Sequence, residues 1–185
     1  MKRQAGFNLT ELMIVVAIVA ILLSIGVPSY RYITNSYRMS AEVNGLMGDL
    51  MYARSEAIKE GVTVTTCTSK DGHTCDLGAV TWQEGWIIFQ DLQNDQTVDG
   101  LDQVLRVQQA FQGGDTFIAN NNVNAITFNR EGFATTPAAG FASTTIALKD
   151  STANATWTRC LYVTNIGQMS TETPTQLALN SPGCP

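Results

Sequence analysis

The chain opens with MKRQAGFNLTEL, residues 1–12, and continues with MIVVAIVAILLSIGV, residues 13–27. The basic residues Lys2 and Arg3 come first, Gly6 follows, and the apolar run begins only after that glycine. A secretory leader carries its own apolar core before a small-residue cleavage site, and the segment up to Gly6 is too short and too polar for that. Cleavage after Gly6 would therefore leave the apolar run attached to the mature protein.

The apolar run is long enough for one membrane crossing. Residues 7–27 offer about 20 positions, which as a helix extend about 30 Å, the thickness of the hydrocarbon core of a bilayer. Lys2 and Arg3 would hold the N-terminus on the cytoplasmic side. Glu11 lies near the start of this helix, where an unpaired carboxylate is costly. The acid indicates a partner outside this chain, such as the terminal amine of a neighbouring subunit; the alternative is a side chain that only reaches the lipid headgroups.

Gly6-Phe7-Asn8-Leu9-Thr10-Glu11-Leu12, with the apolar run after it, resembles the prepilin signal of type IV pilins and type II secretion pseudopilins. The resemblance implies that Gly6 precedes the prepilin-peptidase cut and that Phe7 becomes the N-methylated terminus. It also implies that the carboxylate of Glu11 meets the terminal amine of the adjacent subunit during assembly. Asn8 stands where the family usually has Thr, and Thr10 where it usually has an apolar residue. Neither departure affects the glycine or the acid.

Helical periodicity continues beyond the apolar run. Pro28 removes a backbone hydrogen bond where that run ends, so we expect a kink there. Apolar residues then recur at three- and four-residue spacing, with charged residues such as Asp49 and Arg54 on the other side. The pattern predicts one long helix over residues 9–60, with Gly61 as its C-terminal stop.

After Gly61 the pattern changes to short runs rich in β-branched residues, which are typical of strands. We expect strands at residues 62–67, 86–90, 103–107, 125–128, 144–148 and 159–163. A long helix followed by antiparallel strands indicates an α+β fold. The predicted organisation is a leader over 1–6, a transmembrane and assembly helix over 7–27, an amphipathic continuation over 28–60 and a β-rich globular head over 61–185.

The head carries a second resemblance. Residues 52–61 read YARSEAIKEG, a Gly85-Trp86 pair opens an apolar strand, and Phe128 precedes Gly132 by four positions. This set resembles the GspH/FimT group of minor pilins and minor pseudopilins over most of the chain. The resemblance implies the type IV pilin fold, in which a long N-terminal α-helix packs on an antiparallel β-sheet head.

The same resemblance implies a minor pilin that helps to initiate type IV pilus assembly as part of a tip or priming complex. Such a protein lies in the bacterial inner membrane with a periplasmic head, and after assembly in the pilus at the cell surface. Its implied partners are other minor and major pilins, prepilin peptidase and the inner-membrane assembly platform. Two alternatives share these motifs: a minor pseudopilin of a type II secretion system, and a DNA-binding minor pilin of natural transformation.

Four cysteines follow the apolar run, at Cys67, Cys75, Cys160 and Cys184. Their even number and loop-like surroundings favour two disulfides in an oxidising compartment, most simply Cys67 with Cys75 and Cys160 with Cys184. Four reduced thiols are the alternative. A zinc site is disfavoured because no Cys-x-x-Cys pair occurs and His73 is the sole histidine. With one histidine and no phosphate-binding glycine loop, the sequence predicts neither an enzyme nor a cofactor.

Charge disfavours a nucleic-acid partner. The formal net charge is −5, and it becomes −7 if Lys2 and Arg3 leave with the leader. Some FimT-like minor pilins bind DNA through a Gly-Arg-x-Arg motif near the C-terminus. The matching residues here are Gly167-Gln168-Met169-Ser170, without either arginine. An acidic head that lacks these arginines repels a phosphate backbone.

One acidic loop, residues 91–102, is a weak candidate calcium site. It contains Asp91, Asn94, Asp95 and Asp99, whose side-chain oxygens are the kind of donor that calcium takes. The loop lacks the alternating spacing and the terminal glutamate of an EF-hand. A polar connection between two strands is the competing interpretation.

Overall fold

A single helix, α1 (Leu9–Glu60), is the longest element of the fold. The computed structural model describes residues 8–78, 81–111, 113–135, 143–177 and 184. Helix α1 continues through Pro28 and ends at Gly61, where φ is +71° and the N–H donates to the Ala57 carbonyl oxygen at 3.0 Å. Glycine adopts this left-handed conformation at little cost, so it ends the helix as expected.

The chain divides into two compact units, residues 1–38 and 39–185. In the first unit, described from Asn8, the large apolar side chains of α1 are exposed. In the second unit α1 buries one stripe at three- and four-residue spacing, made of Met39, Val43, Leu46, Leu50, Ala53 and Ala57. Such a stripe is the core-facing side of an amphipathic helix.

The first sheet has the strand order β3-β2-β1-β5-β6, with every pair antiparallel. Its strands are β1 (Val64–Thr68), β2 (Gly85–Gln90), β3 (Gln103–Gln109), β5 (Ala125–Phe128) and β6 (Ala134–Thr135). Trp86 and Ile88 belong to the main core with α1, whereas Ile87 and Phe89 belong to a second apolar cluster with Cys67 and Ala125. Burial on both faces explains why this part of β2 is a continuous apolar run.

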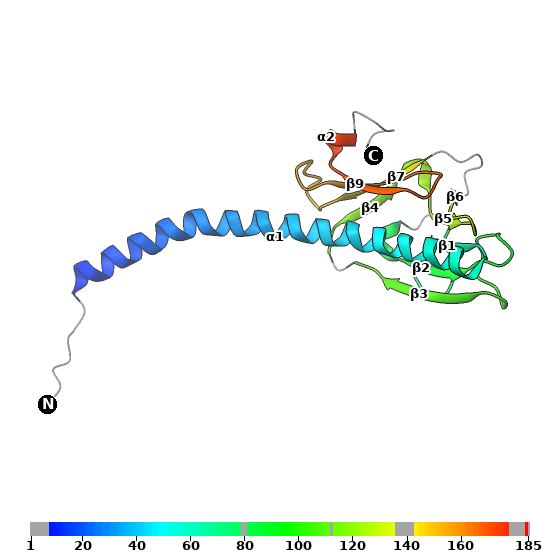
Figure 1. The fold of residues 1–185 in the computed structure, drawn as a ribbon. Coiled ribbons are helices and arrows are strands. Elements are labelled where there is room, and N and C mark those ends of the chain that lie inside the picture. The colour runs from blue at the N-terminus through cyan, green and yellow to red at the C-terminus, as the bar shows by residue number, and fades with distance from the viewer. Residues whose placement is uncertain (1–7, 79–80, 112, 136–142, 178–183, 185) are drawn as a thin grey trace. The chain divides into compact units, whose positions relative to one another are not determined.

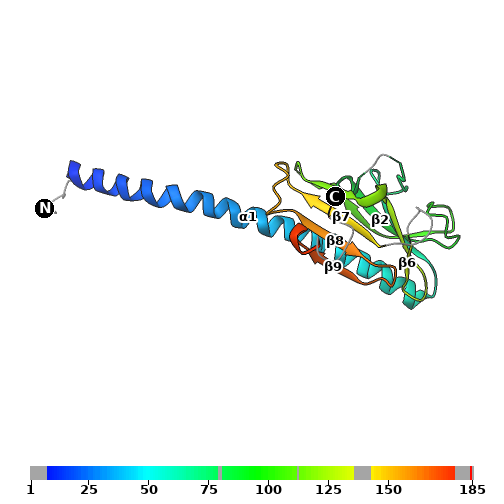
Figure 2. The same ribbon diagram turned by 90° about the horizontal axis from the view of Figure 1, so that it is seen from above.

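The second sheet has the order β4-β7-β8-β9 and is also antiparallel. Its strands are β4 (Thr116–Ala119), β7 (Thr144–Lys149), β8 (Arg159–Val163) and β9 (Met169–Glu172), and a short helix, α2 (Pro174–Leu177), follows. The second half of α1 lies beside both sheets (Figures 1 and 2), and the main core joins it to Ile146, Leu148 and Leu161 of this sheet. The main core therefore lies where one helix meets two sheets.

The six expected strands correspond to β1, β2, β3, β5, β7 and β8, with ends that differ by at most two residues. Strands β4, β6 and β9 were not expected, because they contain only two to four residues and β9 is largely polar. Such short segments become strands only through pairing with neighbours that lie far away in the sequence. The head consequently has two antiparallel sheets where one was expected.

Asp49 is buried and bonds to Trp86 of the main core, although its place in the helical pattern suggested the solvent side. Its Oδ2 accepts a hydrogen bond from Trp86 Nε1 at 2.9 Å, and its Oδ1 pairs with Arg106 Nη1 at 2.5 Å. The Arg106 guanidinium in turn lies 4.3 Å from the centroid of the Tyr52 ring. Both carboxylate oxygens thus have partners, as burial of a charge requires.

Two disulfides connect Cys67 with Cys75 and Cys160 with Cys184. The first lies in the second apolar cluster, on the outer face of the first sheet, which is the face turned away from α1. The second connects β8 to residue 184 and encloses β9 and α2 between its two cysteines. No free cysteine remains among the residues in the described ranges.

Arg54 connects α1 to both sheets. Its Nε donates to the carbonyl oxygen of Gly132 at 3.0 Å, and its Nη2 donates to that of Ile166 at 3.1 Å. Gly132 lies in the β5–β6 turn and Gly167 in the β8–β9 turn, with φ of +82° and +74°. The turns approach so closely that a Cβ on Gly167 would lie 2.3 Å from the Gly132 carbonyl oxygen. We call Arg54 with Gly132, Ile166 and Gly167 the Arg54 clasp.

The substitution Gly167→Ala should destabilise the protein by about 2 kcal/mol or more, because the new Cβ combines backbone strain with a clash against the backbone of the other turn. Denaturant unfolding of the full chain in detergent measures the change. Gly100→Ala is the matched control, since a Cβ at Gly100 has no atom within 4 Å and its φ is not positive. Equal stability of the two variants would contradict this account of the clasp.

Candidate functional site

Glu11 lies in the first turn of α1, where the Asn8 carbonyl oxygen accepts hydrogen bonds from the N–H groups of Glu11 and Leu12 at 3.0 and 3.1 Å. A carboxylate is favourable there because the helix N-terminus carries partial positive charge. The side chain is exposed and has no hydrogen-bond or ion-pair partner among the described residues, which begin at Asn8. Gly6 and Phe7, the expected cleavage and methylation positions, lie outside the described residues.

The apolar residues that follow Glu11 are exposed on all sides of the helix. Every large apolar side chain from Leu12 to Val27 is at least 44% exposed within the chain. By length and composition, this part of α1 is able to cross a membrane. A helix that is apolar all round requires cover by lipid or by other protein helices. Glu11 is thus the only acidic residue within residues 9–27, and it lies at the start of a segment suited to an apolar environment.

The acidic loop 91–102 is organised by its first residue. Asp91 is fully buried, and its Oδ1 accepts a hydrogen bond from the Asp95 N–H at 3.0 Å. Its Oδ2 accepts from the Gln96 N–H at 3.0 Å and from the Thr65 hydroxyl at 2.7 Å. The carboxylate therefore supplies acceptors for two backbone N–H groups of the loop. Its bond to Thr65 also attaches the loop to β1.

The three aspartates of the calcium hypothesis each accept hydrogen bonds from backbone N–H groups of their own loop. Asp91 points into the head, Asp95 Oδ1 accepts from the Thr97 N–H at 2.9 Å, and Asp99 Oδ1 accepts from the Leu101 N–H at 2.9 Å. No cluster of three His, Cys, Asp or Glu side chains suited to a metal ion occurs within the part of the chain that the structure describes. The contacts support the interpretation of this segment as a polar connection between β2 and β3.

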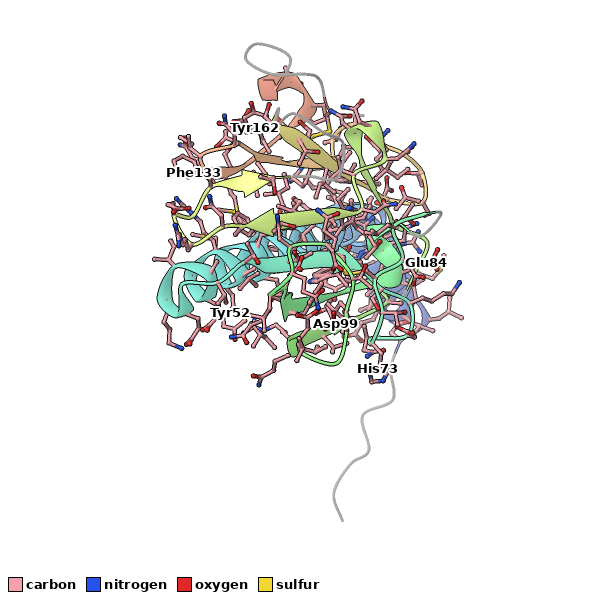
Figure 3. All side chains as sticks on the ribbon, turned by 90° about the vertical axis from the view of Figure 1, so that its right-hand side faces the viewer. Tyr52, His73, Glu84, Asp99, Phe133 and Tyr162 are labelled. Atoms are coloured by element: carbon pink, nitrogen blue, oxygen red, sulfur yellow. A yellow bond between two sulfur atoms is a disulfide. The ribbon has the colours of Figure 1, made fainter. Side chains whose placement is uncertain are left out.

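The loop closed by the Cys67–Cys75 disulfide is held by a second aspartate. The Asp71 carboxylate accepts hydrogen bonds from the N–H groups of His73 and Thr74, each at 2.8 Å, and from the Thr74 hydroxyl at 2.8 Å. These bonds, the His73 N–H first, lower the pKa of Asp71 well below its ordinary value. His73 itself is exposed, on the side of the head shown in Figure 3. It contributes to the loop through its backbone.

The β8–β9 turn and the start of β9 contain the residues that stand at the place of the DNA-binding motif. Gly167, Gln168 and Met169 line an open hollow of about 480 Å³ together with residues of α1, including Arg54. Arg54 is the cation in this lining, and its guanidinium donates to two backbone carbonyls. Helical periodicity did not reveal this role, because the two carbonyl groups lie 78 and 112 positions away from Arg54 in the sequence.

Two family models match the chain. The model of the prokaryotic N-terminal methylation motif matches residues 1–27, which contain Gly6, Phe7, Glu11 and the apolar run. The model of type II transport protein GspH matches residues 42–167, which is more than half of the chain. The second match includes Arg54 and both glycine turns of the clasp.

Similar proteins come from Pseudomonas aeruginosa. A fimbrial protein of this organism is 37% identical over 78 residues, which are 42% of this chain and 50% of that protein. The chain thus spans about half the length of the curated relatives it matches. The type IV minor pilin FimU is similar in two crystal forms, with TM-scores of 0.59 and 0.53 at 20% and 21% identity. These alignments cover 83% and 80% of this chain and 99% of the other, and they show a shared fold.

Asp91→Ala should destabilise the protein by about 1–3 kcal/mol, because a buried hydroxyl and two backbone N–H groups lose their acceptor. Denaturant unfolding of the full chain measures the loss, and Asp95→Ala, which removes an exposed carboxylate, is the control. Added calcium should leave the unfolding midpoint of the unsubstituted chain unchanged, because both oxygens of Asp91 already accept hydrogen bonds. A rise with calcium would restore the cation-site hypothesis.

Proposed function

Because the chain belongs to the GspH/FimT family of type IV minor pilins and pseudopilins, we propose that it is a minor pilin that helps to initiate type IV pilus assembly in a priming complex at the pilus tip. The observation that carries this proposal is the combination, in one chain, of a methylation-motif match over residues 1–27 and a GspH match over residues 42–167. The first supplies a helix for assembly, and the second supplies a head of the minor-component type.

In this proposal prepilin peptidase cleaves after Gly6, and Phe7 becomes the N-methylated terminus. Helix α1 then stays in the inner membrane, with the head in the periplasm, until the assembly platform takes up the subunit. The exposure of the apolar side chains from Leu12 to Val27 supports this sequence of events, because lipid covers them first and neighbouring pilin helices cover them later. The two disulfides fit an oxidising periplasm.

Glu11 is the proposed docking residue. Its carboxylate lacks a partner among the residues described from Asn8 onward, and it precedes an apolar surface in which an unpaired charge costs several kcal/mol. The terminal ammonium group of a neighbouring processed subunit would remove that cost. Pairing of the two charges would favour one axial position of the incoming subunit over all others.

A minor pseudopilin of a type II secretion system is the second candidate, and the name of the matching family model favours it. The fimbrial name of the curated relatives, at 37% identity, favours the pilus instead. A DNA-binding minor pilin is the third candidate. Against it stand the acidic net charge and the segment that follows β8, in which Gln168 and Ser170 occupy the places of the two arginines.

Deletion of the gene should reduce surface pili while the amount of major pilin in the membrane stays constant, because priming acts after pilin synthesis. Pili sheared from the cells and quantified on gels measure the effect, and complementation with the unsubstituted gene is the control. Secreted enzymes are assayed in parallel. Lost secretion with normal pili would favour the pseudopilin, and normal pili with normal secretion would contradict both roles.

Glu11→Val in the complemented deletion strain should reach the inner membrane at the normal level but lower piliation about tenfold or more, since a lost charge pair worth over about 1.4 kcal/mol is a tenfold effect. Thr10→Val, at the neighbouring position, is the matched control and should restore piliation. Quantified sheared pili and an immunoblot of membranes give the two readouts. Full piliation by Glu11→Val would exclude the docking role.

A further inference from the structure

Four large apolar side chains are exposed around the Arg54 clasp, and we call them the clasp patch. Their exposed fractions lie between 48% and 54%, and the residues are Met51, Ile58, Phe133 and Ile166. Met51 and Ile58 line the hollow of about 480 Å³ that Gly167 and Met169 also line. Large apolar side chains exposed beside one another on a soluble head indicate an interaction site.

The clasp fixes the backbone segments on which this patch lies. Met51 and Ile58 are seven positions apart on α1, so they lie on one face about two turns apart. A Cβ on Gly132 would lie 2.9 Å from Ile58 Cδ1, which places the β5–β6 turn directly against this side chain. Arg54 then fixes both turns through the carbonyl oxygens of Gly132 and Ile166. A surface ordered in advance loses little conformational entropy when a partner binds.

Charged groups around the patch already have partners within the head. The nitrogen–oxygen distances of these ion pairs are 3.4 Å for Lys59–Glu56, 2.9 Å for Lys59–Glu60 and 2.9 Å for Arg130–Glu131. The Arg54 guanidinium donates its hydrogen bonds to backbone carbonyls. Nucleic acids and anionic lipid surfaces bind through cations that neutralise phosphate. An apolar centre with a rim of paired charges instead matches the anatomy of a protein–protein interface.

We propose that the clasp patch is the surface through which this head contacts the head of a different pilin subunit, which places an uncharged apolar side chain beside Met51 and Ile58. The inference rests on the proposed function, because it takes the partner from the same filament. A second copy is a poorer partner. Contact of the patch with another face of an identical head would repeat from copy to copy into a ring or a filament of this chain alone, whereas the proposed function places the chain among other pilins.

Site-specific photo-crosslinking in cells tests the proposal. The full chain carries a photoreactive amino acid at Met51 or at Ile58, in the deletion strain that it complements. Leu101 is the control position, because it is 72% exposed and belongs to the loop of Asp99, a residue that lies well away from Phe133 on the head (Figure 3). Illumination at the patch should yield an adduct whose second polypeptide is another pilin, recognised by mass spectrometry from a processed, N-methylated N-terminus. The yield from Leu101 should be about tenfold lower or less.

Three results would overturn the proposal: an adduct of two copies of this chain, an adduct with nucleic acid, or no adduct from either patch position while piliation is normal. A normally piliated deletion strain would remove the priming role, yet a pilin adduct from Met51 would still support the patch, so the two failures are distinguishable. A substitution in the patch tests whether its apolar side chains contribute to binding of the partner. Met51→Glu should lower the adduct yield from Ile58 about tenfold, whereas Leu101→Glu should not, with both disulfides intact on non-reducing gels in each case. An unchanged yield with Met51→Glu would contradict the proposal.

Discussion

The head depends on one packing arrangement, in which two sheets share the buried stripe of a single helix. Leu46 and Leu50 of α1 lie in one core with Trp86 of the first sheet and Leu161 of the second. Each sheet taken alone would expose an apolar face, and the helix covers both faces at once. The Arg54 clasp reinforces the same junction at the level of the backbone, and the Ala134 N–H adds a bond of 2.8 Å to the Asn165 carbonyl oxygen. The helix whose first part exposes apolar side chains on all sides is therefore also the element that organises the head.

Local patterns were sufficient to predict α1 and most of the longer strands. Helical period, the apolar run and the stop at Gly61 are properties of neighbouring residues, so the sequence displays them directly. The roles of Asp49 and Arg54 depend on partners 57, 78 and 112 positions away, and no local pattern encodes those distances. The same holds for β6 and β9, which are strands only because of their neighbours. Of the candidate site, Glu11 lies in the first turn of α1 as expected, while its assembly role and the roles proposed for Gly6 and Phe7 remain predictions.

The acidic loop shows how one composition permits two interpretations. A row of aspartates suggests an ion, but the structure uses Asp91 as an internal acceptor that folds the loop back on β1. Val98 from this loop and Cys75 from the disulfide loop pack on the second apolar cluster. Two polar-looking segments thus cover the outer face of the first sheet. The aspartates in these segments accept hydrogen bonds from backbone N–H groups that have no strand partner near the apolar surface.

The position of the Cys160–Cys184 disulfide also bears on how a subunit matures. Helix α1 contains no cysteine, so its folding does not depend on thiol oxidation. Strand β9 and helix α2 lie between the two cysteines, and bond formation encloses them in a covalent ring anchored on β8. Before closure, this edge of the second sheet is held by non-covalent contacts alone. Under the proposed function, this disulfide closes after the helix enters the membrane and before assembly, so completion of the head depends on the thiol-oxidising capacity of the compartment.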